Sequence, residues 1–202
     1  NPTNKQKEYG GLYDADNGVM VTGEISQEML GGYNKLVLQY ANKGLAQNMV
    51  SQGGGWYDMW NYVNDASGYR VINTGLIPIT DKLSFNHVLT WGSADDTTLY
   101  TEKSRLISLV GRAQYQFTEY VRLIGEVGGF YQKDTYTDGA KYKQSGEKYT
   151  IALGLADGPD FMSRPELRVF ASYLNDSEKG QSFQDGTANN NWNFGIQVEA
   201  WW

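Results

Sequence analysis

The chain has 202 residues, a formal net charge of −6, no cysteine and a single histidine. The negative charge argues against a nucleic-acid partner, and the lack of cysteine with only one histidine excludes thiolate and multi-histidine metal sites. No stretch approaches the ~18 consecutive apolar residues of a membrane-spanning helix, whereas a mean hydropathy of −0.54 is compatible with a membrane β-barrel, in which half of each strand is polar.

Nine segments alternate between apolar and polar residues with period two, which is typical of strands with one apolar face. Polar, glycine-rich segments separate them, and no amphipathic helical pattern competes. In chain order, the predicted strands lie near 18–27, 33–42, 68–77, 82–92, 104–117, 120–131, 146–156, 165–174 and 192–202. The sequence therefore predicts an all-β, antiparallel protein of about nine strands.

The connections between these strands alternate in length. The short ones lie near 28–32, 78–81, 117–120 and 157–164, and the long ones near 43–67, 93–103, 133–145 and 175–191. Short turns on one side and long loops on the other are typical of transmembrane β-barrels, whose short turns face the periplasm. We therefore expect the Gram-negative outer membrane as the location, with contacts to lipid and lipopolysaccharide.

The last predicted strand has the clearest alternation, because Trp192, Phe194, Ile196, Val198 and Trp202 share one parity. An aromatic final residue is common at the periplasmic end of such barrels. Counting strand directions back from this end places every long loop outside the cell, in agreement with the loop lengths.

Nine is an unexpected number, because bacterial single-chain barrels have an even number of strands. An unpaired strand edge in lipid would leave backbone groups without hydrogen bonds, at a high cost in free energy. We therefore expect residues 1–202 to form the C-terminal half of one larger barrel domain, completed by an N-terminal half.

The parity of the last strand, carried upstream, assigns the side chains that face the lumen. Ionisable groups at membrane depth are tolerated where they face water or a partner, and Arg and Glu can hydrogen-bond sugar hydroxyls. The predicted polar binding residues are Arg70, Arg112, Arg122, Glu126 and Arg168. The alternative is that they simply line a polar lumen.

Two aromatic residues, Tyr33 and Trp201, carry the lumen parity near the periplasmic end. Flat rings can stack on the apolar face of a pyranose, so both are candidate sugar-binding residues. The alternative for Trp201 is the aromatic girdle at the membrane rim.

Two sequence features could indicate other functions. His87, the only histidine, has the lipid parity, which favours packing at a subunit contact over catalysis; we expect no enzyme activity, no cofactor and no metal. The loop segment Trp56-Tyr-Asp-Met-Trp60 is either packed on itself or forms a surface that captures sugar or docks a bacteriophage.

Three motifs resemble the C-terminal half of the maltoporin-type sugar porins, a family that includes maltodextrin, sucrose and β-glucoside porins. They are Gly32-Tyr-Asn-Lys-Leu-Val-Leu-Gln-Tyr-Ala41, Ser163-Arg-Pro-Glu-Leu-Arg-Val-Phe-Ala-Ser-Tyr173 and Phe194-Gly-Ile-Gln-Val-Glu-Ala-Trp-Trp202. The resemblance implies an 18-stranded barrel, a homotrimer and passive diffusion of sugars along a row of aromatic rings.

Within this resemblance, Tyr33 and Trp201 match aromatic residues of the sugar path. Met162 stands where maltoporins carry a path tryptophan, and the adjacent Phe161 is a candidate substitute. This departure favours a shorter sugar or a glucoside over long maltodextrins. The alternatives are a soluble all-β carbohydrate-binding module and a small monomeric oligosaccharide porin.

Overall fold

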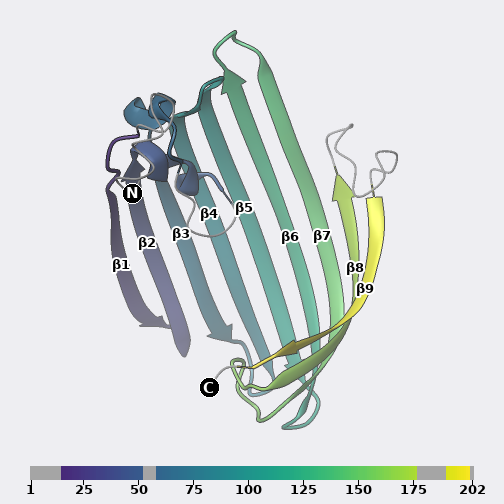
Figure 1. Cartoon of the computed structure of the whole chain (residues 1–202). Helices are drawn as coiled ribbons and strands as arrows, with labels where there is room; N and C mark the ends of the chain where they lie inside the picture. The colour runs from purple at the N-terminus through teal and green to yellow at the C-terminus, as the bar shows by residue number, and fades with distance from the viewer. Residues whose placement is uncertain (1–14, 52–57, 177–189, 201–202) are drawn as a thin grey trace.

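The computed structural model describes residues 15–51, 58–176 and 190–200, and within them nine strands form one antiparallel sheet. Each strand pairs with its neighbours in the chain, so β1 and β9 are the two edges of an open, curved sheet (Figure 1). The predicted all-β fold and its nine strands are confirmed. No helix in the described ranges is long and apolar enough to cross a membrane. The strands are β1 Met20–Met29, β2 Gly32–Asn42, β3 Ser67–Pro78, β4 Leu83–Thr98, β5 Thr101–Gln116, β6 Val121–Tyr136, β7 Lys141–Ala156, β8 Glu166–Asp176 and β9 Asn190–Glu199.

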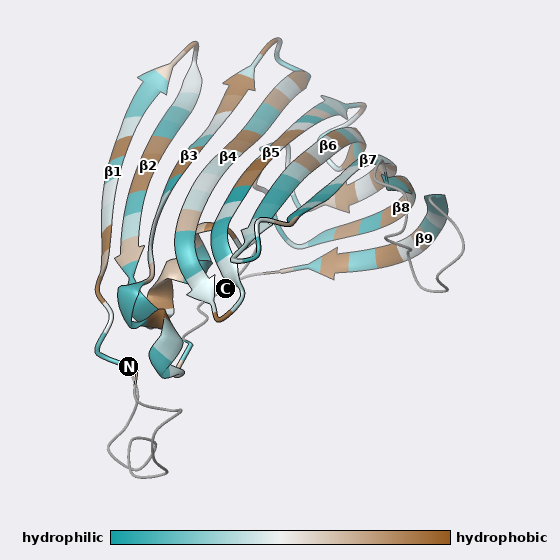
Figure 2. Cartoon of the chain, turned by 90° about the horizontal axis from the view of Figure 1, so that it is seen from above, coloured by the Kyte–Doolittle hydropathy of each residue, from teal (hydrophilic) through white to brown (hydrophobic). Residues whose placement is uncertain are grey.

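The two faces of the sheet differ in chemistry, as the parity predicts. Along β6 to β8, exposed apolar side chains such as Val127, Ile151 and Val169 alternate with concave residues that include the buried arginines Arg122 and Arg168. Figure 2 shows the resulting bands of apolar and polar residues along the strands. Directly paired residues share a face, so the antiparallel register extends the apolar face across the whole sheet.

The prediction of long loops near 93–103 and 133–145 is wrong, because the strands continue through most of both segments. β4 and β5 are joined by residues 99–100, and β6 and β7 by residues 137–140. The outer parts of these strands are polar on both faces and therefore lack the alternation that marks a strand, yet backbone hydrogen bonds and the Asp95–Lys103 ion pair of 3.0 Å still join them. Each of β4 to β7 has 16 residues, more than the 9–11 that span a bilayer.

In the connection near 43–67, the described residues 43–51 and 58–66 form no strand and fold onto the concave face. This connection contains two short 3-10 helices, η1 Lys43–Met49 and η2 Asn61–Asp65. Met49 packs in a small core with Ala41, Ala94 and Leu106, all of which have the lumen parity. A Cβ atom on Gly92 would lie 2.0 Å from the Met49 carbonyl oxygen, so a glycine is needed for η1 to approach β4 this closely. The loop therefore covers part of the concave wall at the end opposite the short turns.

Candidate functional site

A row of concave side chains runs across the sheet at the level of Tyr33. The register places Tyr33, Leu76, Asn86, Arg112 and Glu126 opposite one another from β2 to β6. Directly opposed side chains on one face of a sheet are close neighbours. Three predicted binding residues, Tyr33, Arg112 and Glu126, are therefore brought to one level of the concave wall.

The Arg112–Glu126 ion pair is the accessible charged group of this row. Nε and Nη2 of Arg112 donate to the same Glu126 oxygen, Oε2, at 2.9 and 2.7 Å. The side chains remain 28% and 17% exposed. A guanidinium has five N–H donors and a carboxylate has several lone-pair sites, so this pair can hydrogen-bond a solute hydroxyl while it stays intact.

Arg70 lies apart from this row, because its partner Gln39 is six residues beyond Tyr33 on β2, or ~20 Å along the strand. Its Nε donates to Gln39 Oε1 at 2.8 Å and its Nη1 to the Ser51 carbonyl at 3.4 Å. Arg70 therefore ties β3 to the long loop at the outer end of the concave face.

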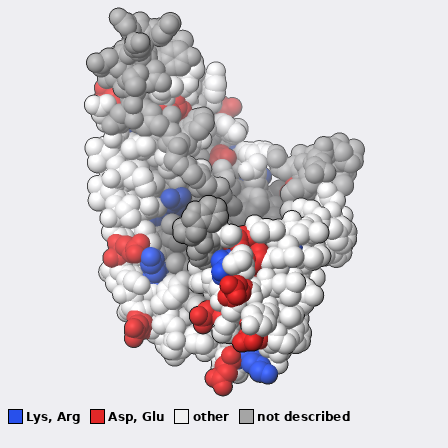
Figure 3. Space-filling model, turned by 60° about the horizontal axis from the view of Figure 1, so that its bottom comes forward, with Lys and Arg blue, Asp and Glu red and all other residues white. Residues whose placement is uncertain are grey.

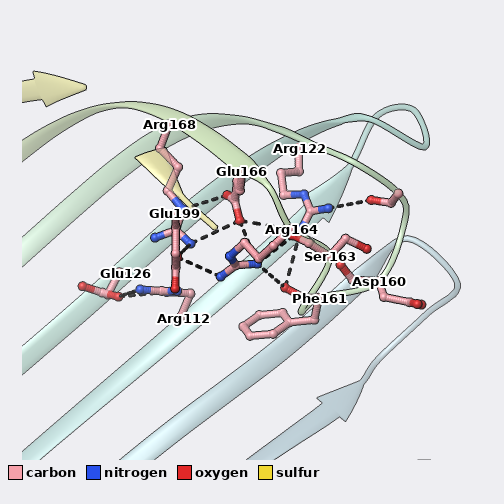
Figure 4. A network of polar contacts seen from close by, with 11 residues as sticks. Arg112, Arg122, Glu126, Asp160, Phe161, Ser163, Arg164, Glu166, Arg168 and Glu199 are labelled. Atoms are coloured by element: carbon pink, nitrogen blue, oxygen red, sulfur yellow. Dashed lines mark hydrogen bonds and ion pairs between the residues drawn. The ribbon is translucent and has the colours of Figure 1, made fainter. Parts of the chain in front are cut away.

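At the end of the short turns, three arginines and two glutamates form an ionic cluster (Figure 4). Arg168 binds Glu166 through two bonds of 2.7 and 3.1 Å, and Glu199 through one of 2.6 Å. Arg164 bridges the same two carboxylates at 3.1 and 2.9 Å. Figure 3 shows that charged atoms gather toward the lower rim of the molecule, at the bottom of the view.

Arg122 completes the cluster and is fully buried, with 0% of its side chain exposed. Nη1 donates to the Asp160 and Phe161 carbonyls at 3.2 and 3.5 Å, and Nη2 to the Gly158 carbonyl at 2.7 Å. These bonds fix the turn between β7 and β8. In this arrangement Arg122 holds backbone in place, and a solute in the lumen cannot reach it.

Phe161 and Met162 lie in the turn that Arg122 holds. The Phe161 carbonyl also accepts a 3.4 Å bond from Arg164, and its ring extends away from the Arg122 guanidinium (Figure 4). The Met162 side chain is exposed. The cluster thus fixes the turn that carries Phe161 and Met162. Trp201, the other predicted path residue, lies outside the described residues.

Of the loop segment Trp56-Tyr-Asp-Met-Trp60, residues 58–60 pack within the long loop, whereas Trp56 and Tyr57 lie outside the described residues. The Asp58 amide donates to the Gly44 carbonyl at 2.8 Å, and the Tyr62 hydroxyl donates to Asp58 Oδ2 at 3.0 Å. Burial and this hydrogen bond raise the pKa of Tyr62 to about 12. The ring of Trp60 stacks on that of Tyr62 with centroids 6.3 Å apart. These contacts favour self-packing for residues 58–62.

His87 lies on the convex face, away from the concave row. Its Nε2 is 2.9 Å from Asn73 Oδ1, and the Asn73 side-chain amide donates in turn to Asn34 Oδ1 at 3.1 Å. In the part of the chain that the structure describes, no group of three or more histidine, aspartate or glutamate residues could hold a metal ion.

The sequence reasoning did not single out Arg164, Glu166 and Glu199 as a cluster. A signal was present, because Glu166 and Glu199 share the lumen parity on adjacent strands and are directly paired. Two carboxylates at such a short distance require cations between them, which Arg164 and Arg168 supply.

Comparisons with known proteins agree with one another. A family model described as LamB porin matches residues 1–202. The chain is 83% identical over 202 residues to Maltoporin 1 of Klebsiella pneumoniae subsp. pneumoniae and 82% identical to Maltoporin 2 of Yersinia pestis. It is 53% identical over 204 residues to Maltoporin 1 of Aeromonas salmonicida. These alignments include 100% of this chain but only 48%, 48% and 47% of the relatives, so the chain spans about half their length.

Proposed function

This chain belongs to the LamB porin family, and we propose that it forms one half of an outer-membrane porin through which sugars diffuse passively. The observation that carries the proposal is the division of one curved sheet into an apolar convex face and a concave face with charged and aromatic side chains. An apolar outer surface around a polar interior is what a barrel in a bilayer requires. A soluble carbohydrate-binding module would instead bury an apolar face in a core.

The open edges of the sheet support the view that a second half completes the barrel. β1 and β9 have no outer neighbour among the described strands, and the relatives are about twice as long. Backbone groups at an edge have no water to bind inside a bilayer. We propose an 18-stranded barrel as the complete unit, assembled as a homotrimer in the Gram-negative outer membrane.

Sugar passage would use two kinds of contact along the concave face. The ring of Tyr33 can stack on the apolar face of a pyranose. Arg112 and Glu126 lie in the same row but three and four strands away, where they can bind the hydroxyls of a sugar unit on that part of the wall. Trp201 is proposed as a second stacking ring and Arg70 as a further polar contact, while Arg168 is held by Glu166 and Glu199. No covalent step is involved, so the protein is a channel rather than an enzyme.

The substrates proposed are maltodextrin-like or β-glucoside-like sugars. Met162, at the turn between β7 and β8, stands at an aromatic position of the sugar path, and the adjacent Phe161 is proposed as its substitute. Met162 offers an apolar contact but no flat ring, which favours shorter sugars. The outer loop that contains Trp60 is proposed as a surface for bacteriophage attachment.

The test uses the full-length protein reconstituted in planar bilayers. Sugars from a panel of maltodextrins and glucosides should block the ion current in a concentration-dependent way. Tyr33→Ala and Trp201→Ala should each weaken the block, whereas Tyr40→Ala, on the convex face of the same strand as Tyr33, should leave it unchanged. The proposal fails if no sugar blocks the current, or if the full-length protein is recovered as a folded monomer without detergent.

A further inference from the structure

Phe130 is an aromatic residue on the concave face of β6 that the row of Tyr33 does not include. It lies four residues beyond Glu126, or ~13 Å further toward the outer end of the strand. The register pairs it directly with Ser108 on β5 and with Gly146 on β7. Its side chain is 37% exposed, so part of the ring is open to the lumen.

The ring lies against the wall of the sheet because glycines leave room beside it. A Cβ atom on Gly146 would come within 3.3 Å of Phe130 Cε1 and 2.8 Å of the Asn175 carbonyl oxygen. Gly128, two residues before Phe130, lies on the same face of β6. These two glycines replace side chains that would otherwise fill the wall next to the ring, and a depression results.

Two hollows of the concave wall meet at Phe130. One has a volume of about 340 Å³ and is lined by Phe130, Val110, Ser108, Glu126 and Lys148 among others. The other has a volume of about 430 Å³ and is lined mainly by hydroxyl, amide and carboxylate groups, among them Ser104, Gln132 and Asp134. The ring of Phe130 is shared by both.

The groups around the ring combine an apolar surface with hydrogen-bond donors and acceptors, as a pyranose would require. One ring and the methyl groups of Val110 offer apolar contact, while Glu126 accepts and Lys148 and Ser108 donate at the rim. In the second hollow, the Asp134 carboxylate accepts from Ser104 Oγ at 2.7 Å and from the Gln132 amide at 3.3 Å, which fixes these polar groups in place. An apolar surface with a few positioned polar groups is the usual form of a small-ligand site.

We propose that Phe130 is an additional stacking position for a pyranose unit of the transported oligosaccharide, with Glu126 and Lys148 binding its hydroxyls. This inference rests on the proposed sugar-porin function. Because Phe130 lies between the long loop and the Arg112–Glu126 row, a sugar that enters from the outer end meets it first. A saccharide of several units contacts both levels, whereas a monosaccharide occupies one at a time.

The experiment measures sugar block of the ion current through the full-length protein, with a monosaccharide and an oligosaccharide of one series. Phe130→Ala and Phe130→Leu should raise the half-blocking concentration of the oligosaccharide about two- to tenfold, the range expected for one lost aromatic contact. Phe130→Tyr keeps the flat ring, so its half-blocking concentration should stay near that of the wild type. The effect on the monosaccharide should be smaller.

Tyr131→Ala is a matched control, because Tyr131 is the next residue of β6, is also 37% exposed and has the opposite parity. It should leave the block unchanged. Phe130→Leu and Phe130→Tyr retain a large apolar side chain, so they decide the question even if Phe130→Ala does not assemble. The inference is overturned if the oligosaccharide blocks the Phe130→Leu channel as well as it blocks the wild-type channel. It is also overturned if Tyr131→Ala weakens the block as much as Phe130→Leu does. If the wild-type protein is not blocked by any sugar, the proposed function falls and this inference with it.

Discussion

Replacing Glu166 by glutamine should destabilise the barrel far more than the same change at an exposed ion pair. Glu166 is 1% exposed and lies 2.7 Å from Arg168 Nε, 3.1 Å from Arg164 Nη1 and 4.0 Å from Arg122 Nη1. In the Glu166→Gln variant, Glu199 would be the one carboxylate of the cluster left to balance three guanidinium groups.

The magnitude follows from the burial of the cluster. Removing one partner of a buried ion pair costs about 3–5 kcal/mol, because the remaining charge has lost both water and its counterion. Glutamine keeps a carbonyl oxygen that accepts from Arg168, so the lower end applies, about 3 kcal/mol. The turn that carries Phe161 and Met162 should loosen at the same time, since Arg122 and Arg164 hold its carbonyl groups.

The assay is urea unfolding of the full-length protein in detergent, together with the temperature at which its gel mobility changes. The control is Glu24→Gln, which breaks the Lys35–Glu24 pair of 2.8 Å with side chains 35% and 49% exposed. That variant should lose at most about 1 kcal/mol. Equal losses of unfolding free energy for Glu166→Gln and Glu24→Gln would refute the reasoning, because burial of the ion pair would then make no difference to stability.

Three further changes test the faces of the sheet and the packing of its loop. Arg112→Gln removes a positive charge from the lumen and should shift the reversal potential in a salt gradient toward cation selectivity; a shift toward anions, or none, would contradict its lumen position. Gly92→Ala should cost about 1–3 kcal/mol by overpacking against η1, whereas Gly125→Ala, which has no atom within 4 Å of the added carbon, should be near neutral in urea unfolding. Ile151→Lys on the convex face should lower the free energy of unfolding by about 2–4 kcal/mol near the bilayer midplane. Thr150→Lys, one residue away on the concave face, should be tolerated. Similar losses of stability for both variants would mean that the two faces are misassigned.

The sequence predicts the strands well where one face is apolar. In β9, Trp192, Phe194, Ile196 and Val198 fix the parity, and a slip of one residue would move all of them to the other face. The same constraint applies to every strand that crosses the apolar band. Parity could therefore be transferred from the last strand to the first without knowledge of the register.

The sequence does not predict the outer parts of β4 to β7, because no face there needs to be apolar. Ser93 pairs with Arg105, and Asp95 pairs with Lys103. These pairs are held by backbone hydrogen bonds and side-chain contacts that leave no periodic trace in the sequence. The sequence pattern of such a polar segment therefore predicts a loop, although the segment is a strand.

The role of Arg122 was beyond sequence reasoning for a different reason. Its partners are carbonyl groups of residues 158, 160 and 161, about 40 positions away in the chain. Any residue type supplies a backbone carbonyl, so no pattern of side chains marks such a partner. The parity of Arg122 is the same as that of Arg112, and only the fold separates a turn-holding arginine from one that faces the lumen.

Exposure therefore ranks the candidate binding residues better than residue type does. A solute hydroxyl can be bound only by a group that still has both accessible surface and hydrogen-bonding capacity. Arg112 and Glu126 keep both, whereas Arg168 is engaged by Glu166 and Glu199 and Arg122 has no exposed side-chain surface. For an aromatic ring, which binds a sugar by stacking, accessible surface is the criterion. The Phe130 ring is as exposed as that of Tyr33, at 37%, which is why a ring that no motif marks belongs with Tyr33 as a candidate for the sugar path.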